Sequence, residues 1–328
     1  MVGVFRQKYS GNIVTLFFLG VLLKLPVFIF PQPALENAQD GFAYKKLIQI
    51  LEPFATAFPS VYSLLAFILI FFNAITLTRF INNQRLMVSP NYLPGMAYLL
   101  LTSLVPEFNV LSSQLVVTVF YLIIFIQIFR SFKPNVAKTD IFNAGLMLGL
   151  ATTFFTPSLV FLAWLIIALA LLRPFKLNEW LLMLLGLLTP YYFAIAILYL
   201  KNSDFSILFT QFDFGVNTQS PTLWIAGAVF LILAPLLTGA YYSQSYAGRM
   251  LIHVRKAWSL FFIFILVCIL AIFFSPTAGY ENWVMVLTPI AAFHGFGYYN
   301  AELKLYPKIV FWTTVLFIVA SQLFSCSW

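Results

Sequence analysis

The sequence predicts an all-α fold, a polytopic transmembrane bundle of about eleven helices. Hydrophobic residues fill 62% of the 328 positions and charged residues only 9%, and these few charges lie between long apolar runs. A soluble protein has about a quarter charged residues, so this chain cannot cover a globular surface with water-binding groups. Phe alone occupies 38 positions, which suits contact with lipid. An integral membrane protein is therefore the expected class.

Eleven apolar runs are candidates for membrane spans, since a span takes about 20 residues, or fewer where neighbouring protein covers its ends. They are Ile13–Phe30, Ser60–Thr78, Tyr92–Val105, Val110–Phe129, Ile141–Phe155, Ser158–Leu172, Leu181–Leu200, Thr222–Tyr242, Trp258–Phe274, Trp283–Tyr298 and Ile309–Leu323. The first run resembles a signal peptide, but its length and the lack of a small-residue cleavage site predict a retained helix.

The charged residues separate into two sets when these runs are counted as crossings. With the N-terminus inside, 14 of the 18 Lys and Arg residues lie in cytoplasmic segments: Arg6, Lys8, Arg79, Arg85, Arg130, Lys133, Lys138, Arg173, Lys176, Arg249, Arg255, Lys256, Lys304 and Lys308. Most acids lie outside: Glu36, Asp40, Glu52, Glu107, Asp204, Asp213 and Glu281. Short loops rich in Lys and Arg stay in the cytoplasm, so this sorting predicts a cytoplasmic N-terminus and a periplasmic C-terminus. The net charge of +8 then reflects topology, and we expect no nucleic-acid partner.

The run from Ile141 to Leu172 could form one kinked helix or two short helices. One helix would be about 48 Å long, which exceeds the hydrocarbon core of about 30 Å, and it would move Arg173 to the outer side. We therefore predict a hairpin with its outer turn at Thr156-Pro157, since proline disfavours helix in the residue before it. The runs on either side of Pro106-Glu107 repeat this arrangement.

The longest polar connection is the first periplasmic loop, residues 31–59. Apolar residues recur in it at helical spacing, which predicts an amphipathic helix along the membrane surface. These residues are Ala43, Leu47, Ile50, Leu51 and Phe54. No segment has the composition of a soluble domain, so residues 1–328 are expected to form a single transmembrane domain. The basic inner loop Ser243–Ala257 can rest on anionic headgroups.

Two outer acids, Glu36 and Asp40, lie four residues apart just before this surface helix. On a helix they would share one face. Close carboxylates raise one another's proton affinity, which suits a general base, and they can hold a divalent cation. Alternatively, Asp40-Gly41 makes a turn and Asp40 caps the surface helix. Glu107, at the next outer turn, is a third acid on the same side and could line one cavity with them.

Lys24 and His294 are ionisable residues within predicted spans. Lys24 can extend its ammonium to the outer interface, or it can bind a phosphate group. His294 has no acidic neighbour in the sequence, which favours a hydrogen-bonded packing role over a functional one. The two cysteines, Cys268 and Cys326, are too few and too far apart for a disulfide framework or a metal cluster.

The order of these parts resembles the GT-C superfamily of membrane glycosyltransferases, which includes protein O-mannosyltransferases and aminoarabinose transferases. Glu36 and Asp40 match the catalytic acid that follows the first span in that superfamily, and Glu107 matches a later acid or phosphate-binding group. The segment 145–157, followed by Ser158–Leu172, is similar to its paired short helices. The resemblance covers about residues 1–200, and residues 201–328 supply additional transmembrane helices.

The chain departs from the superfamily in two respects. Its acids are four residues apart where the superfamily has an adjacent acidic pair, and it lacks the large outer C-terminal domain that many members carry. The chain as a whole is similar to a family of multi-pass inner-membrane proteins of Bacteroidota, a family label that implies no activity.

The superfamily resemblance implies a glycosyltransferase of the bacterial inner membrane that takes a sugar from a polyprenyl-phosphate donor at the periplasmic face. Asp40 or Glu36 would deprotonate the acceptor hydroxyl. Glu107 would bind a metal or orient the acceptor, and Lys24 or Lys201 would face the donor phosphate. The second hypothesis is a non-catalytic subunit or scaffold of an envelope-assembly complex with envelope protein partners. A secondary transporter is disfavoured, because few ionisable groups approach the membrane midplane and no inverted repeat is visible.

Overall fold

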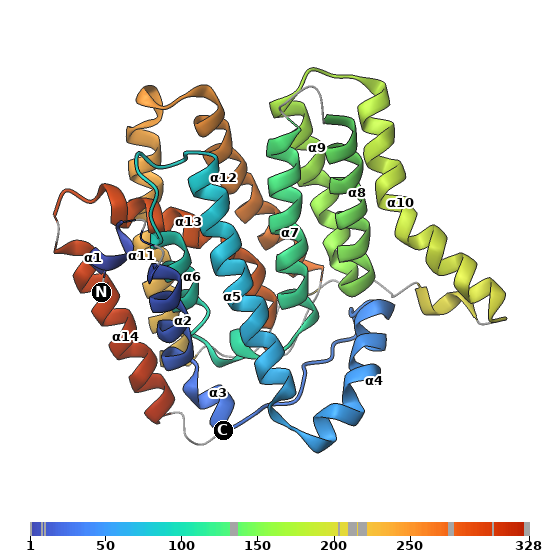
Figure 1. Cartoon of the computed structure of the whole chain (residues 1–328), viewed down its shortest axis with the longest axis horizontal. Helices are drawn as coiled ribbons and strands as arrows, with labels where there is room; N and C mark the ends of the chain where they lie inside the picture. The colour runs from blue at the N-terminus through green and yellow to red at the C-terminus, as the bar shows by residue number, and fades with distance from the viewer. Residues whose placement is uncertain are drawn as a thin grey trace.

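The computed structural model describes residues 2–7, 9, 11–131, 137–202, 204–208, 215, 222–274, 279–303 and 305–324, which form a helical bundle (Figure 1). The expected all-α class is confirmed, since extended pairing in this part of the chain is limited to an isolated bridge between Asp40 and Phe155. Five residues named above lie outside the described residues: Lys8, Lys133, Asp213, Lys304 and Cys326.

Apart from α1 and α4, the helices overlap the apolar runs. In chain order they are α1 (Val2–Phe5), α2 (Gly11–Leu23), α3 (Leu25–Ile29), α4 (Phe42–Ala57), α5 (Ser60–Asn83), α6 (Leu93–Leu101), α7 (Ser113–Arg130), α8 (Ala137–Phe154), α9 (Phe161–Leu172), α10 (Leu177–Leu200), α11 (Leu223–Ser245), α12 (Ile252–Phe273), α13 (Val284–Asn300) and α14 (Tyr306–Phe324). Short 3-10 helices, η1 (Pro106–Asn109), η3 (Thr156–Val160), η4 (Phe205–Leu208), η5 (Ala247–Arg249) and η6 (Glu281–Trp283), join some of them.

Five helices in the described part of the chain are long and apolar enough to cross a membrane: α5, α7, α10, α11 and α12. Others are shorter because the sequence interrupts them. The first run breaks at Lys24 into α2 and α3, where Pro26 lies in the first turn of α3. The run from Ile141 to Leu172 forms two helices, as predicted, with the break at Phe155. A multi-pass membrane protein fits these helices, and the number of eleven spans stays a prediction.

Polar contacts join the helix connections at two opposite ends of the bundle. At one end the contacts link segments that the charges predict to be cytoplasmic: Arg6 with the Tyr299 carbonyl, His253 with the Gln84 carbonyl, Lys256 with the Leu171 carbonyl and Arg173 with Glu179. At the other end they link segments predicted to be periplasmic: Tyr44 with the Leu35 and Leu111 carbonyls, Gln114 with Asn282 and Gln322 with the Leu23 carbonyl. The sorting of charges along the sequence therefore matches a sorting of contacts in space.

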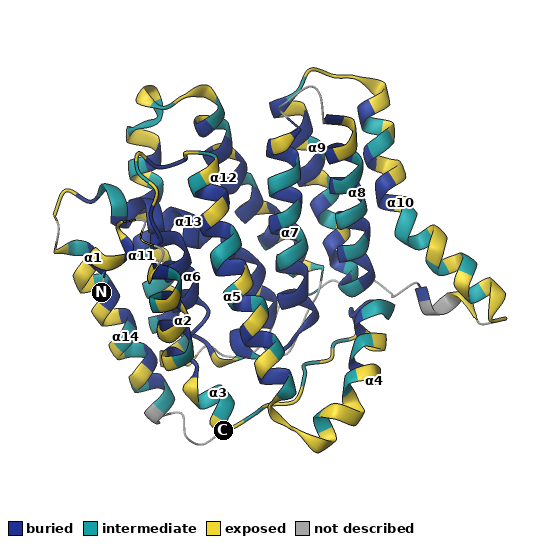
Figure 2. Cartoon of the chain, in the orientation of Figure 1, coloured by how far each residue is buried: buried dark blue, intermediate teal, exposed yellow. Residues whose placement is uncertain are grey.

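The predicted surface helix is α4, at the lower edge of the view in Figure 2. Its buried side is formed by Tyr44 and Ile48. Two residues of the predicted apolar face, Ile50 and Phe54, are 57% and 61% exposed, so protein covers only part of that face. An exposed apolar strip beside Lys45 is the pattern of a helix that lies on a membrane surface.

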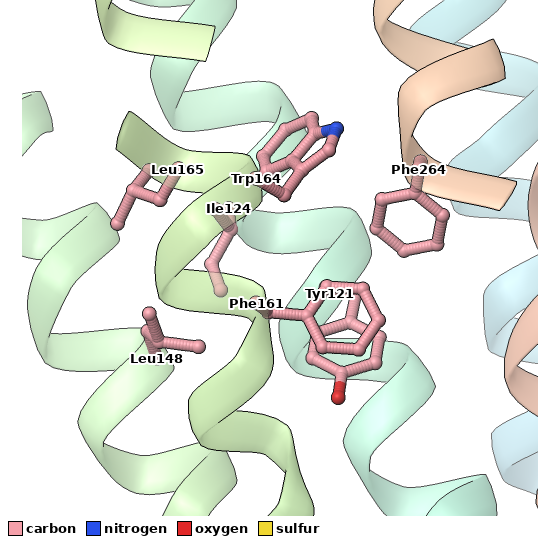
Figure 3. A pocket seen from close by; sticks show the side chains of 7 residues that line it. All are labelled: Tyr121, Ile124, Leu148, Phe161, Trp164, Leu165 and Phe264. Carbon is pink, nitrogen blue, oxygen red and sulfur yellow. The ribbon is translucent and has the colours of Figure 1, made fainter. Parts of the chain in front are cut away.

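The core of the bundle is aromatic. Tyr121 of α7 stacks on Phe161 of α9 with ring centroids 3.9 Å apart, and Trp164 and Phe264 close the cluster (Figure 3). The indole N–H of Trp164 donates to the Leu260 carbonyl, and the Tyr121 hydroxyl donates to Ser158. The space among these side chains is too small for a water molecule, so this cluster packs the core and is not a binding site.

Glycines allow α8 and α10 to pack with their backbones in contact. A Cβ atom at Gly186 of α10 would lie 2.2 Å from the Phe142 carbonyl oxygen, and one at Gly145 of α8 would lie 2.1 Å from the Met183 carbonyl oxygen. Small residues at these positions permit the close approach that stabilises helix pairs in membranes, where van der Waals contact replaces the hydrophobic driving force.

We predict that Gly186→Ala lowers the unfolding free energy by about 1–3 kcal/mol, because the added methyl group forces the two helices apart. Helix propensity alone would give the opposite sign, since alanine is favoured over glycine inside a helix by about 1 kcal/mol. Thermal unfolding of the purified protein in mild detergent measures the change. Gly248→Ala is the matched control, because a Cβ at Gly248 meets nothing within 4 Å. A Gly186→Ala variant as stable as Gly248→Ala would show that the close packing does not constrain the fold.

Candidate functional site

Three of the predicted site residues, Lys24, Asp40 and Glu107, belong to a polar cluster at the end of the bundle that the charges predict to be periplasmic, and we call it the outer polar cluster. It is built by the junction of α2 and α3, the loop after α3, the C-terminal end of α6, η1, the first turn of α7 and η6. Its members are Lys24, Asn37, Asp40, Thr102, Glu107, Asn109, Ser113, Gln114, Glu281 and Asn282.

Backbone pairing with the break between α8 and α9 holds the loop that carries Asp40. The Gly41 N–H donates to the Phe154 carbonyl at 2.9 Å, and the Thr156 N–H donates to the Gln39 carbonyl at 3.2 Å. Gly41 permits this contact, since a Cβ there would lie 2.1 Å from the Thr153 carbonyl oxygen. These two backbone hydrogen bonds fix the position of Asp40 beside Ser113, the first residue of α7.

The Asp40 side chain is 0% exposed, and both of its oxygens accept hydrogen bonds. Oδ2 accepts from the Asn37 backbone N–H at 2.7 Å, and Oδ1 accepts from the Ser113 hydroxyl. Burial raises the pKa of the Asp40 carboxyl to about 6, although these hydrogen bonds and the charge of Lys45 act in the opposite direction. The predicted turn is present, but Asp40 does not cap α4, whose N-cap residue is Gly41 and has no side-chain cap.

The other two predicted acids lie in different surroundings. Glu36 is exposed, and because residues 31–37 are not helical it shares no helix face with Asp40. Its charge contributes the least to the raised pKa of Asp40. Glu107, in η1, is half-buried, and its Oε2 atom is buried without a hydrogen-bond partner among the described residues. Burial raises the pKa of Glu107, and the charge of Glu281 adds to this effect.

Glu281 is the acid whose place in the site the sequence did not reveal. It opens η6 and is 4% exposed, and its Oε1 atom accepts from the Asn37 side-chain amide at 3.3 Å. Asn37 therefore connects Asp40 with Glu281. The sequence predicts that Glu281 is one of the outer acids, but no local pattern in the sequence links it to the first loop.

The two predicted phosphate-binding lysines lie far apart. The Lys24 ammonium is buried inside the protein, where it donates to the Thr102 hydroxyl at 3.1 Å and to the Asn109 side-chain carbonyl. It belongs to the outer polar cluster and does not extend to the surface. Lys201 follows the C-terminal end of α10 and is exposed, and this end of α10 diverges from the bundle in Figure 1. The structure therefore does not bring Lys201 to Asp40.

The arrangement of the described side chains gives little support for a metal site. Among the described residues, no three His, Cys, Asp or Glu side chains gather in a way that could hold a metal ion. His294 has the hydrogen-bonded packing position that we expected, since its Nε2 atom lies 2.8 Å from the Ile232 carbonyl oxygen of α11. Cys268 is a buried free thiol.

The chain was compared with protein-family models, with curated proteins and with solved structures, and none of the three comparisons gave a match.

We predict that the unfolding free energy falls as the pH rises from about 4 to 7. The pKa of Asp40 in the folded state is above its value in an unfolded chain, so the native protein holds this proton more tightly. The resulting stabilisation is complete below the unfolded pKa and is lost as the pH passes the folded pKa of about 6. The unfolding free energy lost in this way is about 3 kcal/mol. Glu107, whose pKa is also raised, contributes in the same direction.

Asp40→Asn removes the titrating group with little change in shape, so the variant should lose most of this pH dependence. Urea unfolding in mild detergent at several pH values measures the slope. Glu52→Gln, which neutralises an exposed acid on α4, is the matched control and should keep the wild-type slope. Equal slopes for Asp40→Asn and the wild type would contradict the assignment.

Proposed function

We propose that this chain is a GT-C-like glycosyltransferase of the bacterial inner membrane and that the outer polar cluster is its site. It would take a sugar from a polyprenyl-phosphate donor at the periplasmic face for the assembly of an envelope glycan or glycoconjugate. The observation that carries this proposal is Asp40, a carboxyl group in the first loop whose pKa is raised to about 6. A general base works best when its pKa lies near the operating pH.

Contacts around Asp40 suit a base that acts on a hydroxyl group. Ser113 donates its hydroxyl hydrogen bond to Oδ1 of Asp40, which is the contact that an acceptor hydroxyl makes with its base. Three buried polar atoms nearby have no partner among the described residues: Gln39 Nε2, Gln39 Oε1 and Glu107 Oε2. Such atoms can orient an acceptor.

The donor would lie on the other side of the cluster. Of the two lysines, Lys24 alone belongs to the cluster, so we assign it to the donor phosphate. The polyprenyl chain would run along exposed apolar residues of α2 and α3, among them Phe18 and Ile29. Glu107, with Glu281 beside it, is the pair of carboxylates that could take part in binding a divalent cation.

We predict that the double variant Asp40→Asn, Glu36→Gln loses sugar transfer and still inserts into the membrane. The purified protein in liposomes is supplied with polyprenyl-phosphate sugars, and transfer to envelope acceptors is followed. Removal of a general base costs about 10²–10⁴-fold in rate. Glu52→Gln, an exposed acid of the same loop outside the cluster, is the matched control and should retain full activity. Full activity of the double variant would exclude Asp40 and Glu36 as the base.

The second candidate function is a non-catalytic subunit or scaffold of an envelope-assembly complex. Its support is the complete burial of Asp40, whose two oxygens are already engaged by Ser113 and Asn37. In this case the cluster fixes the shape of the periplasmic end. The protein purified in mild detergent would then carry stoichiometric envelope partners, and the double variant would retain them.

Both functions require the topology that the charges predict: eleven spans, a cytoplasmic N-terminus and a periplasmic C-terminus. We predict that a cysteine at Glu52, on α4, reacts with a membrane-impermeant maleimide added to spheroplasts, and that a cysteine at Arg249, in η5, does not. Both side chains are exposed, so the membrane alone should cause the difference. The background is a chain in which Cys268 and Cys326 are replaced by alanine, and permeabilised cells should label both variants. The reverse pattern in spheroplasts would invert the topology.

A further inference from the structure

A recess lies at the opposite end of the bundle from the outer polar cluster, where α11 ends and α12 begins. Its volume is about 30 Å³, enough for roughly two water molecules. The lining comes from the last turn of α11, the η5 segment and the first three turns of α12, and its polar members are Ser243, Gln244, Arg255, Trp258 and Ser259.

The lining carries one positive charge, Arg255, while the hydroxyls of Ser243 and Ser259 donate to the Ala240 and Arg255 carbonyls of their own helices. Trp258 is 4% exposed, and its indole N–H is buried without an acceptor among the described residues. Buried N–H groups almost always have an acceptor, so an unpaired one indicates that something else supplies it. Arg255 and Ser259 lie three residues before and one residue after Trp258 on the same helix, and no acid lines the recess.

The surroundings favour an anion. α12 begins at Ile252 with no side-chain cap, so backbone N–H groups of its first turn are free to attract negative charge. The recess and its surroundings therefore combine a guanidinium group, an unpaired N–H donor and a helix N-terminus, which together suit a phosphate group.

The position of the recess indicates that this phosphate belongs to a lipid. Both α11 and α12 are long and apolar enough to cross a membrane, so their shared end lies at the headgroup level. Exposed apolar side chains flank it along both helices, among them Leu237, Tyr241 and Leu266. Tyr242 and Tyr246 stack beside it, and aromatic residues are typical of this level of a membrane. Acyl chains can contact these side chains while the phosphate reaches Arg255.

We propose that the recess between α11, η5 and α12 is a binding site for the phosphate group of an anionic phospholipid. This site is independent of the outer polar cluster and of any transfer reaction there. Its ligand would hold the α11–α12 connection at the membrane surface, and Arg255 and the Trp258 N–H would be its main contacts.

Native mass spectrometry of the detergent-purified protein tests this proposal with added phosphatidylglycerol, phosphatidylcholine or inorganic phosphate. We expect one phosphatidylglycerol to be retained, at least fivefold more tightly than phosphatidylcholine, and not to be displaced by millimolar inorganic phosphate. Arg255→Gln should weaken its binding at least fivefold, because the guanidinium group of Arg255 lines the recess and would contact the phosphate directly. Arg249→Gln removes the same charge from a residue outside the lining, so it is the matched control and should change binding less than twofold.

Trp258→Phe keeps an aromatic ring in place and removes only the N–H donor, so it should also weaken phosphatidylglycerol binding. Thermal unfolding without lipid shows that each variant is folded. Equal effects of Arg255→Gln and Arg249→Gln would overturn the site, because binding would then follow overall charge. Equal retention of phosphatidylcholine, or displacement by inorganic phosphate, would overturn its assignment to an anionic lipid.

Discussion

The contact between the first loop and the break separating α8 from α9 is the constraint on which the end of the bundle with the outer polar cluster depends. Two backbone hydrogen bonds, from Gly41 to Phe154 and from Thr156 to Gln39, fix the loop just before α4 begins. Without this break, α8 would continue and leave the loop backbone unpaired at the edge of an apolar bundle, where an unpaired group is costly. Pro157 prevents that continuation. The position of Asp40 and the direction of α4 therefore follow from a proline more than a hundred residues away.

Charged groups are compensated differently at the two ends. At the end opposite the outer polar cluster, Arg173 and Glu179 form a bidentate ion pair with both N···O distances at 2.8 Å. In the outer polar cluster, neutral side chains and backbone groups hold both Asp40 and Lys24, and neither has an opposite charge as its hydrogen-bond partner. Neutral partners offset only part of the cost of burying a charge, which is why burial dominates the pKa of Asp40. The folded protein therefore retains an electrostatic cost at the outer polar cluster.

The sequence predicted the elements of the fold well because each follows from local physics. Apolar length gives the helices, proline gives the break at Phe155, and the alternation of basic and acidic connections indicates which loops meet. It predicted the site only in part. Asp40, Glu107 and Lys24 were found because a charge beside or inside an apolar run is conspicuous. Asn37, Ser113 and Glu281 were not, because their contacts join positions 73 and 244 residues apart, and polar residues in loops are ordinary.

The same physical reason explains why the recess beside Trp258 had no signal in the sequence. The basic residues of residues 243–257 were visible and indicated contact with headgroups, but a tryptophan at the start of an apolar run is typical of any membrane interface. Trp258 differs because its N–H group has no acceptor among the described residues once α13 has packed against α12. Whether such an N–H donor has an acceptor depends on the tertiary fold, because other segments of the chain supply the acceptor and enclose the recess beside it. A sequence can therefore indicate where a membrane protein contacts charged lipid. The packing decides whether the protein attracts such lipids in general or binds one of them at a specific site.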